Sequence, residues 1–251
     1  MSYNEDNLEL EQEIQQKLEH KLEPWLQKNT REFDHDVISQ AVSFLEALWK
    51  QNEYLNLTAA KNLEELIEKH FLDALALLDY VKIITGNIGD LGTGGGFPGI
   101  PLKLFLPEVE CYLIDASRKK INFLKYTAEQ INLKQIYFLN DRAENLARKS
   151  LYREQFDYIT VRAVAELSVL LELGLPLIKQ GGSMFVYKGP RSKEELKKAE
   201  NALYLCRGKL HGKWYYTLPS GEARSILEIK KTAPISDKYP RKPGKPEKNP
   251  L

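Results

Sequence analysis

A glycine-rich segment at residues 90–99 constrains the fold of this chain more than any other feature. It contains five glycines, at positions 92, 94, 95, 96 and 99, and it lies where a short buried strand, predicted at residues 88–91, ends. Glycine has no side chain, so its backbone can adopt positive φ and approach a ligand closely. Prolines at positions 98 and 101 suit the first turn of a helix, where a missing N–H costs little. The segment therefore predicts a strand, a ligand-binding turn and a helix in succession.

From residue 87 onward, short apolar runs alternate with segments of helical periodicity, which is typical of a parallel sheet. We expect parallel strands at residues 88–91, 110–114, 136–139, 156–161 and 183–188. Helices are expected after residue 117 and at residues 166–175 and 192–205. Two further strands, at 209–217 and 225–231, are expected to form an antiparallel pair at the sheet edge. The predicted fold class is α/β, with a seven-stranded, mostly parallel sheet.

The first 78 residues have a different pattern and predict a helical extension. Apolar residues recur at helical spacing over residues 5–29, 36–51 and 63–78, which predicts three helices. Asp34 or Asp36 is expected to cap the second of them. We therefore divide the chain into three parts, an N-terminal helical extension (1–78), an α/β domain (79–231) and a C-terminal tail (232–251).

Charge is distributed unevenly along the chain, although the net charge is only +1. Residues 1–29 carry seven acidic residues against three lysines, whereas residues 230–251 carry seven Lys and Arg against two acidic residues. The stretch 233–251 also holds five prolines, so we expect it to be non-helical and extended or disordered in isolation. A stiff basic tail of this kind could contact the phosphate backbone of RNA. The alternative is a solvated tail that has no partner.

Composition and cysteine usage favour a soluble, cytoplasmic protein. Cys111 and Cys206 form no paired motif, which indicates a reducing compartment. The sequence has neither an apolar run of about 18 residues, as a membrane span requires, nor the pattern of a signal peptide. With 43% hydrophobic residues, a chain of 251 residues can bury a core that needs no metal or disulfide.

Two kinds of ligand fit a glycine-rich turn after a strand. Residues 94–99 match the pattern G-x-G-x-x-G of dinucleotide sites, a weak signal on its own. However, Phe97 and Pro98 occupy the place where a pyrophosphate would meet bare N–H groups at a helix N-terminus. Asp115 ends the next strand, beside the turn, where its carboxylate can accept both hydroxyls of a ribose. Because no hydride-transfer residues such as Tyr-x-x-x-Lys are present, we favour S-adenosylmethionine over a dinucleotide.

The residues at the end of the fourth strand constrain the acceptor of the methyl group. Residues 160–163 hold neither the Asn/Asp-Pro-Pro-aromatic motif of exocyclic-amine methylases nor a Pro-Cys nucleophile. An acceptor that already has a free lone pair, such as guanine N7, needs neither of them, and its methylation is helped mainly by placement. The sulfonium leaving group of the donor is already activated, so no metal is implied.

Several short motifs together resemble one known family, the bacterial small-subunit ribosomal RNA guanine-N7 methyltransferases (GidB or RsmG). The resemblance runs from about residue 50 to the last residue and is highly specific in combination. Besides the loop at 90–102, it rests on Asn56-Leu57-Thr58, His70-Phe71-Leu72-Asp73, Arg142-Ala143-Glu144, Arg162-Ala163-Val164, Lys188-Gly189 and the segments 239–244 and 249–251.

The resemblance implies a Rossmann-like, S-adenosylmethionine-dependent methyltransferase that acts as a monomer on 16S rRNA or a small-subunit particle. Its implied target is guanine N7 in the 530-loop region. The donor site that it implies falls on Gly92, Gly94, Phe97, Asp115, Ala116, Ser117, Ala143, Glu144 and Arg162. The residues that it implies on the acceptor side are Arg142, Lys188, Arg224 and His70.

Each of these side chains also has a simpler interpretation. His70 could be a packed or capping histidine, and Lys188 could be a solvated strand end. Arg142 and Arg162 could pair with Glu144 or Asp141 instead of contacting a ligand. For the whole chain, the competing classes are a dinucleotide-dependent oxidoreductase and a non-catalytic RNA-binding protein that keeps the donor fold.

Overall fold

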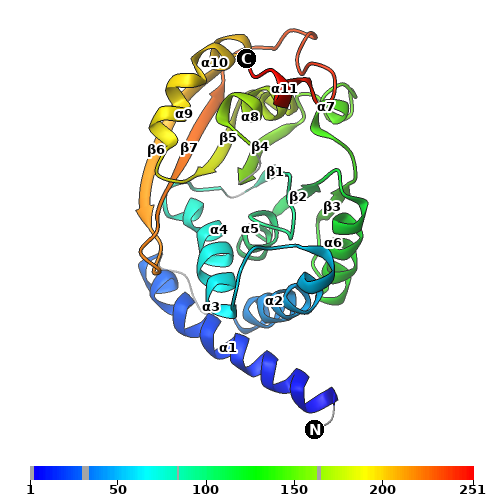
Figure 1. The fold of residues 1–251 in the computed structure, drawn as a ribbon, viewed down its shortest axis with the longest axis vertical. Coiled ribbons are helices and arrows are strands. Elements are labelled where there is room, and N and C mark those ends of the chain that lie inside the picture. Colours follow the sequence, from blue (N-terminus) through cyan, green and yellow to red (C-terminus); the bar gives the residue numbers. More distant parts are fainter. Residues whose placement is uncertain (1–2, 30–33, 84, 163–164) are drawn as a thin grey trace.

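A computed structural model describes residues 3–29, 34–83, 85–162 and 165–251 of the chain (Figure 1). A seven-stranded sheet runs through it in the order β3-β2-β1-β4-β5-β7-β6. The strands are β1 (Gly86–Leu91), β2 (Val109–Ile114), β3 (Ile136–Leu139), β4 (Phe156–Arg162), β5 (Ile178–Lys188), β6 (Gly208–Thr217) and β7 (Ala223–Lys231).

The sheet has the pairing that the sequence predicts. Strands β1 to β5 pair in parallel. Strand β7 then pairs antiparallel with both β5 and β6, which leaves β6 at one edge and β3 at the other. The chain reverses direction across the sheet between β1 and β4, and this switch point is where open α/β sheets bind ligands. The predicted fold class, a mostly parallel seven-stranded α/β sheet with N-terminal helices, is confirmed.

Helices cover both faces of the sheet (Figure 1). Those before the sheet are α1 (Tyr3–Lys28), α2 (His35–Leu55), α3 (Leu63–Leu66), the π-helix η1 (Ile67–Leu72), α4 (Asp73–Leu75) and the 3₁₀-helix η2 (Ala76–Asp79). Those that come after β1 are α5 (Gly99–Phe105), α6 (Arg118–Gln130), α7 (Ala143–Leu146), α8 (Leu167–Gly174), the 3₁₀-helix η3 (Leu175–Leu177), α9 (Ser192–Lys198), α10 (Glu200–Leu205) and α11 (Lys245–Lys248).

The N-terminal helices share a core with one face of the sheet. Ile14 and Leu18 of α1 belong to the same buried cluster as Phe44 of α2, Phe97 of the glycine-rich loop and Leu113 of β2. The Asp34 side chain caps α2 by accepting two backbone N–H groups, as predicted. Burial of each such apolar side chain stabilises the fold by about 1.5–3 kcal/mol, so the helices are held by packing. The proposed boundary at residue 78 stays a prediction.

The third predicted helix, at residues 63–78, contains a π turn that the pattern did not indicate. The N–H of Asp73 donates to the carbonyl of Glu68, five residues back, in place of the usual four. In a regular α-helix that N–H would pair with the carbonyl of Lys69. Here the Lys69 carbonyl accepts a hydrogen bond from Arg162 of β4 at 3.0 Å. The π turn thus makes a backbone acceptor available to a distant side chain, a frequent use of such turns at functional sites.

The C-terminal segment differs from its prediction, because it is packed against the domain and contains the short helix α11. Arg153 donates to the carbonyls of Ile235 and Tyr239, at 2.9 and 3.0 Å, and Arg148 donates to that of Pro240 at 2.6 Å. The side chain of Arg241 holds the fully buried carboxylate of Glu172 in α8 through two nitrogens. These hydrogen bonds order the segment together with Ile235, Tyr239 and Leu251, which pack in or against a buried core cluster. Composition alone could not indicate these contacts.

No helix in these described parts of the chain is long and apolar enough to cross a lipid bilayer.

The pair of Arg241 and Glu172 yields a first prediction. Replacing Arg241 by leucine should lower the free energy of unfolding by about 3 kcal/mol, because it leaves the Glu172 carboxylate buried without its counter-charge. The lower end of the usual range applies, since the Arg241 side chain is 19% exposed. Urea denaturation measures this change.

The neighbouring Lys242→Leu variant serves as the matched control, because Lys242 is exposed. It should unfold like the wild type. A double variant that replaces both Glu172 and Arg241 by leucine should recover most of the lost stability. Equal losses in the Arg241 and Lys242 variants would contradict the prediction.

Candidate functional site

The glycine-rich loop leaves β1 at the switch point and turns around the end of β2. Gly92, Gly94 and Gly96 have φ values of 71°, 58° and 98°, in the left-handed region that favours glycine. The N–H groups of Gly92 and Thr93 both donate to the carbonyl of Ile114, at 2.8 and 3.0 Å. The loop is therefore fixed to the neighbouring strand before any ligand binds.

Asp115 closes this turn from the next strand. Its Oδ2 accepts the N–H of Gly94 at 3.0 Å, and its Oδ1 accepts the N–H of Ser117 at 2.7 Å. Its carbonyl accepts the side-chain amide of Asn140 at 3.0 Å. Each carboxylate oxygen keeps a lone pair beyond these bonds, so Asp115 can also accept hydroxyl groups of a ligand.

A cavity of about 330 Å³ lies at the ends of β1, β2 and β3, and we call it the donor cavity. Six of the nine residues predicted for the donor site line it together, namely Gly92, Gly94, Asp115, Ala116, Ala143 and Glu144. Its other lining residues are Leu91, Ile114, Lys120, Asp141, Arg142, Leu173 and Glu247. The combination of apolar walls, loop glycines and a ribose-accepting carboxylate fits S-adenosylmethionine.

The other three predicted donor residues lie outside the lining of this cavity. Ser117 contributes its N–H to Asp115. Phe97 is buried against Phe44, His70 and Arg162. The Arg162 side chain lines a different cavity. None of the three lines the donor cavity, and their direct contact with a donor stays a prediction.

Asp90, in β1, holds the start of the glycine-rich loop through hydrogen bonds. Its carboxylate is buried and accepts the N–H of Gly99 at 2.9 Å and the hydroxyl of Thr160 at 3.3 Å. Burial raises the pKa of this carboxyl to about 6, although these hydrogen bonds oppose the shift. Gly99 has no space for a side chain, because a Cβ there would lie 2.4 Å from Leu113 and 2.8 Å from Asp90. Asp90 therefore joins β1, β4 and α5 at one point.

A second cavity of about 510 Å³ lies between the π turn and the ends of β4, β5 and β7, and we call it the acceptor cavity. Five cationic and three acidic residues line it, which are Lys61, Lys69, Arg162, Lys188, Arg224, Glu65, Asp73 and Glu222. Its other lining residues are Ala59, Ala60, His70, Tyr187 and Gly189. It shares no lining residue with the donor cavity.

Arg162 is the most constrained cation of the acceptor cavity. One guanidinium nitrogen donates to the carbonyl of Lys69 at 3.0 Å and to Asp73 at 3.2 Å. The other donates to Nδ1 of His70 at 2.8 Å. The guanidinium carbon lies 5.3 Å from the centre of the Phe97 ring, so the guanidinium also stacks on the glycine-rich loop, which we call the donor loop. The expected alternative pairing with Glu144 or Asp141 is absent from the described contacts of Arg162.

His70 has both ring nitrogens engaged. Since Nδ1 accepts from Arg162, the proton is on Nε2, which lies 2.9 Å from the hydroxyl of Thr58. Burial lowers the pKa of His70 to about 3, and the positive charge of Arg162 adds to the shift. The imidazole is therefore neutral at physiological pH and serves as an acceptor that orients Arg162.

The remaining predicted acceptor residues fall into two places. Lys188 lines the acceptor cavity, donates to the carbonyl of Ala165 and pairs with Glu195, both at 2.7 Å. Arg224 also lines it and pairs with Glu222. Arg142 lies in the donor cavity, where its side chain is exposed. Ala163 and Val164, which belong to the Arg162 motif, lie outside the described residues.

Sequence reasoning missed several residues that line the two cavities or bond to a residue that lines them. Lys69 and Glu222 form an ion pair of 2.7 Å across the acceptor cavity, and Tyr216 donates to Asp73 at 2.6 Å. Glu247 reaches the donor cavity from the C-terminal segment. No local motif marks these residues, because the fold brings them together from distant segments.

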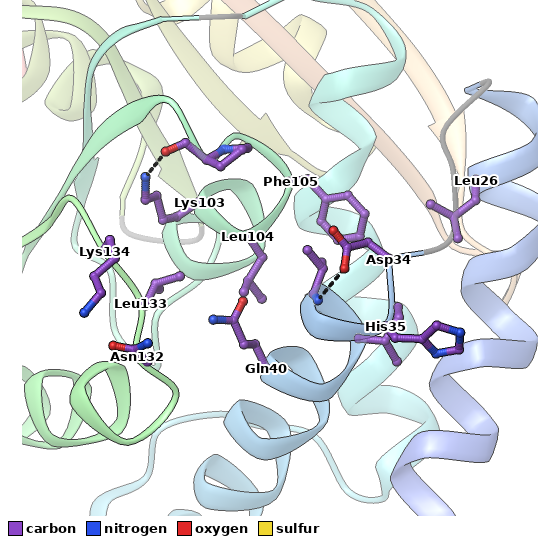
Figure 2. A pocket seen from close by; sticks show the side chains of 13 residues that line it. Leu26, Asp34, His35, Gln40, Lys103, Leu104, Phe105, Asn132, Leu133 and Lys134 are labelled. Atoms are coloured by element: carbon purple, nitrogen blue, oxygen red, sulfur yellow. Dashed lines mark hydrogen bonds between the residues drawn. The ribbon is translucent and has the colours of Figure 1, made fainter.

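A third cavity, of about 690 Å³, lies between the start of α2 and the ends of α5 and α6 (Figure 2). Three of its polar side chains are engaged in local structure. Asp34 caps α2, Lys103 donates to the carbonyls of Pro107 and Val109, and Gln40 donates to that of Ile131. It shares no lining residue with the other two cavities, and we assign it no ligand. Among the described residues, no group of three or more His, Cys, Asp and Glu could hold a metal ion.

Known structures show the same fold. An S-adenosylmethionine-dependent methyltransferase from Aquifex aeolicus superimposes with a TM-score of 0.53 at 14% identity, over 70% of this chain and 97% of that protein. The TYW2 protein of M. jannaschii, solved in complex with AdoMet, gives a TM-score of 0.51 at 12% identity, over 70% of this chain and 81% of that protein. At these identities the likeness shows the fold alone.

Sequence comparison goes further. The family model described as rRNA small subunit methyltransferase G matches residues 37–213. A Carboxydothermus hydrogenoformans protein named ribosomal RNA small subunit methyltransferase G is 42% identical over 226 residues, covering 88% of this chain and 96% of the relative. A protein of the same name from Alkaliphilus metalliredigens is 40% identical over 221 residues, covering 87% and 92%. The chain therefore belongs to the rRNA small subunit methyltransferase G family and is an S-adenosylmethionine-dependent methyltransferase.

Proposed function

We propose that this protein transfers a methyl group to N7 of a guanine in the 530-loop region of 16S ribosomal RNA, and that it acts as a monomer in the cytoplasm. The names of its relatives support a small-subunit RNA substrate. The choice of N7 is supported by one observation. Among the described residues that line the acceptor cavity, no side chain is free to act as a general base, that is, to accept a proton from the acceptor.

Every acidic group that lines the acceptor cavity is occupied. Asp73 accepts from Tyr216 and Arg162, and it is almost fully buried. Glu65 and Glu222 both pair with Lys69. His70 is bonded through both nitrogens. Reactions that must remove a proton from the acceptor need a positioned base with a suitable pKa. This cavity therefore favours an acceptor that loses no proton on methylation.

Guanine N7 is such an acceptor, because its lone pair lies in the ring plane and carries no hydrogen. The bound donor supplies a methyl group on a positively charged sulfur, and the bond to that sulfur breaks as the bond to nitrogen forms. The protein then has to place the base and exclude water. Correct placement of two reactants can contribute up to about 7–11 kcal/mol to lowering a barrier.

The charges of the acceptor cavity fit an RNA strand. Five cations line it against three carboxylates, and Glu195, outside the lining, pairs with Lys188, so a positive balance of one remains after all ion pairs are counted. Phosphate groups are attracted to such surfaces, and their binding weakens with salt. The bonds that Arg162 and Lys188 make within the protein hold the two cations in place before RNA binds.

In the proposed reaction, purified protein transfers labelled methyl from S-adenosylmethionine to unmethylated small-subunit RNA. Because the product is N7-methylguanine, borohydride and aniline treatment followed by primer extension should map a single stop in the 530 loop. RNA that already carries the modification is the control and should accept no label. Absence of label on both free RNA and subunit particles would contradict the proposal.

Arg162 provides a test of the acceptor cavity. An Arg162→Lys variant should lower the turnover rate by about 100-fold, because a lysine cannot make the forked contacts to Lys69, Asp73 and His70 and the reacting groups lose their alignment. Single-turnover kinetics measure the rate, and filter binding should show RNA affinity within about twofold of wild type. Arg207→Lys, at an exposed position, is the matched control and should keep full activity. Unchanged activity in the Arg162 variant would contradict this role of Arg162, whereas RNA binding without methyl transfer by the wild type would favour a non-catalytic RNA-binding protein.

The protonation of His70 predicts a pH dependence of stability. Its pKa is about 3 in the folded protein and near 6.5 when unperturbed, so the unfolded chain binds the additional proton below about pH 6.5. The contribution of His70 to stability is thus complete above that pH and is lost as pH falls towards the folded value. The gap in unfolding free energy between wild type and His70→Gln should narrow from about pH 7.5 to about pH 5.

Urea denaturation at each pH measures this gap. Asp90 titrates in the opposite sense, since its folded pKa is raised, but it is present in both proteins and cancels in the difference. A gap that stays constant over this range would mean that His70 is not held neutral.

A further inference from the structure

The last eleven residues of the chain, 241–251, lie against the donor cavity. In Figure 1 the short helix α11 sits beside α7 and α8, although about 70 residues or more separate it from either in sequence. The sequence had indicated a basic arm for RNA in this region. The contacts of the segment instead lead to the site that we propose for the methyl donor, and our inference about the segment rests on that proposed function.

Arg241 fixes the start of the segment to the domain. Its backbone N–H and its Nε both donate to Oε1 of Glu172 at 2.8 Å, and its Nη2 donates to Oε2 at 2.6 Å. The same nitrogen donates to the carbonyl of Asn249 at 2.8 Å. Because Arg241 binds both α8 and the far end of the segment, residues 241–249 form a closed loop of defined shape.

Gly244, in the middle of this loop, binds a residue that lines the donor cavity. Glu144, which lines the cavity, is 4% exposed, and its Oε1 accepts the N–H of Gly244 at 2.9 Å. Gly244 has a φ of 77°, a conformation that glycine adopts without strain. A buried carboxylate requires hydrogen bonds to stay in place, and this bond comes from the C-terminal segment.

Three residues beyond Gly244, Glu247 itself lines the donor cavity. Glu144, which the segment holds through Gly244, lies in α7 directly after β3, so this wall is at the β3 end of the cavity. Two strands, β2 and β1, separate β3 from β4 in the sheet. The methyl group must face the acceptor cavity, which lies at the β4 and β5 side. The β3 end of the donor cavity is therefore left for the adenosine half of the donor.

We propose that residues 241–251 form the adenosine-side wall of the donor site, with Gly244 as a positioning residue that holds Glu144 and Glu247 as a lining residue. Removal or alteration of this wall weakens binding of every ligand that carries the adenosine group. The reacting sulfur and the acceptor cavity are not touched by it, so the turnover rate at saturating donor stays the same.

The test compares donor binding in the full-length protein, a Glu247→Ala variant and a chain that ends at Arg241. Isothermal titration with S-adenosylmethionine and with S-adenosylhomocysteine should show about tenfold weaker binding in the shortened chain and about threefold weaker binding in the substituted one. The two ligands should weaken by the same factor, since both carry adenosine. The KM for the donor should rise while kcat at saturating donor stays at the wild-type value.

Lys248→Ala is the matched control, because Lys248 is exposed on the same short helix and does not line the cavity. It should bind both ligands like the wild type. The shortened chain keeps Arg241 and its bonds to Glu172, and a circular dichroism spectrum checks that it is folded. Glu247→Ala alters an exposed side chain, so it tests the wall even where the shortened chain is unfolded.

Donor affinities within twofold of wild type in the folded variants would overturn this inference. A loss of RNA affinity with donor binding intact would also overturn it, because the segment would then contact RNA and not the donor. If the wild-type protein bound neither donor nor product, the proposed donor site itself would fail, and that outcome is distinct from the first two.

Discussion

The guanidinium of Arg162 joins three parts of the molecule that are distant in sequence. Arg162 is the last residue of β4, and its guanidinium bonds to the carbonyl of Lys69 and to the side chains of His70 and Asp73. It also stacks on Phe97 of the glycine-rich loop. With 13% of its side chain exposed, its charge is stabilised by Asp73 and by its hydrogen bonds. The N-terminal helices are therefore part of the site, since they supply the acceptors that hold this cation.

The elements of the fold could be predicted from sequence because their signals are local. Residues 136–139 were predicted as a strand and form one with the same bounds, as an apolar run between turn residues should. The helix at 63–78 was predicted as well, but its π turn was not. One additional residue in a turn hardly changes the apolar spacing over sixteen positions, and the turn is stabilised by a contact with Arg162, 93 residues away.

The site, like the fold, was predictable where local sequence and topology place a residue, and not where a distant segment does. Gly92, Gly94 and Asp115 line one cavity because adjacent parallel strands end at the same edge, a consequence of topology alone. Sequence could place Arg142 and Arg162 at strand ends, but it could not say which cavity each would line. That depends on partners such as Asp73 and His70, which come from another segment. Glu247 follows the same rule, since a tail without an apolar pattern gives no sign of where it docks.

The ion pairs of the acceptor cavity explain how it can be positive and still rigid. Lys69 pairs with Glu65 and Glu222, while Arg162 and Tyr216 share Asp73. Each carboxylate lowers the net charge but limits the freedom of the cation beside it, so less conformational entropy is lost when a substrate binds. Phe97 belongs to the donor loop and Arg162 to the acceptor cavity, and the two are in contact. Since packed interiors deform little, a base placed against Arg162 is also placed relative to the donor loop. In the reaction that we propose, which depends on placement and not on proton transfer, this shared contact is how the fold contributes to the rate.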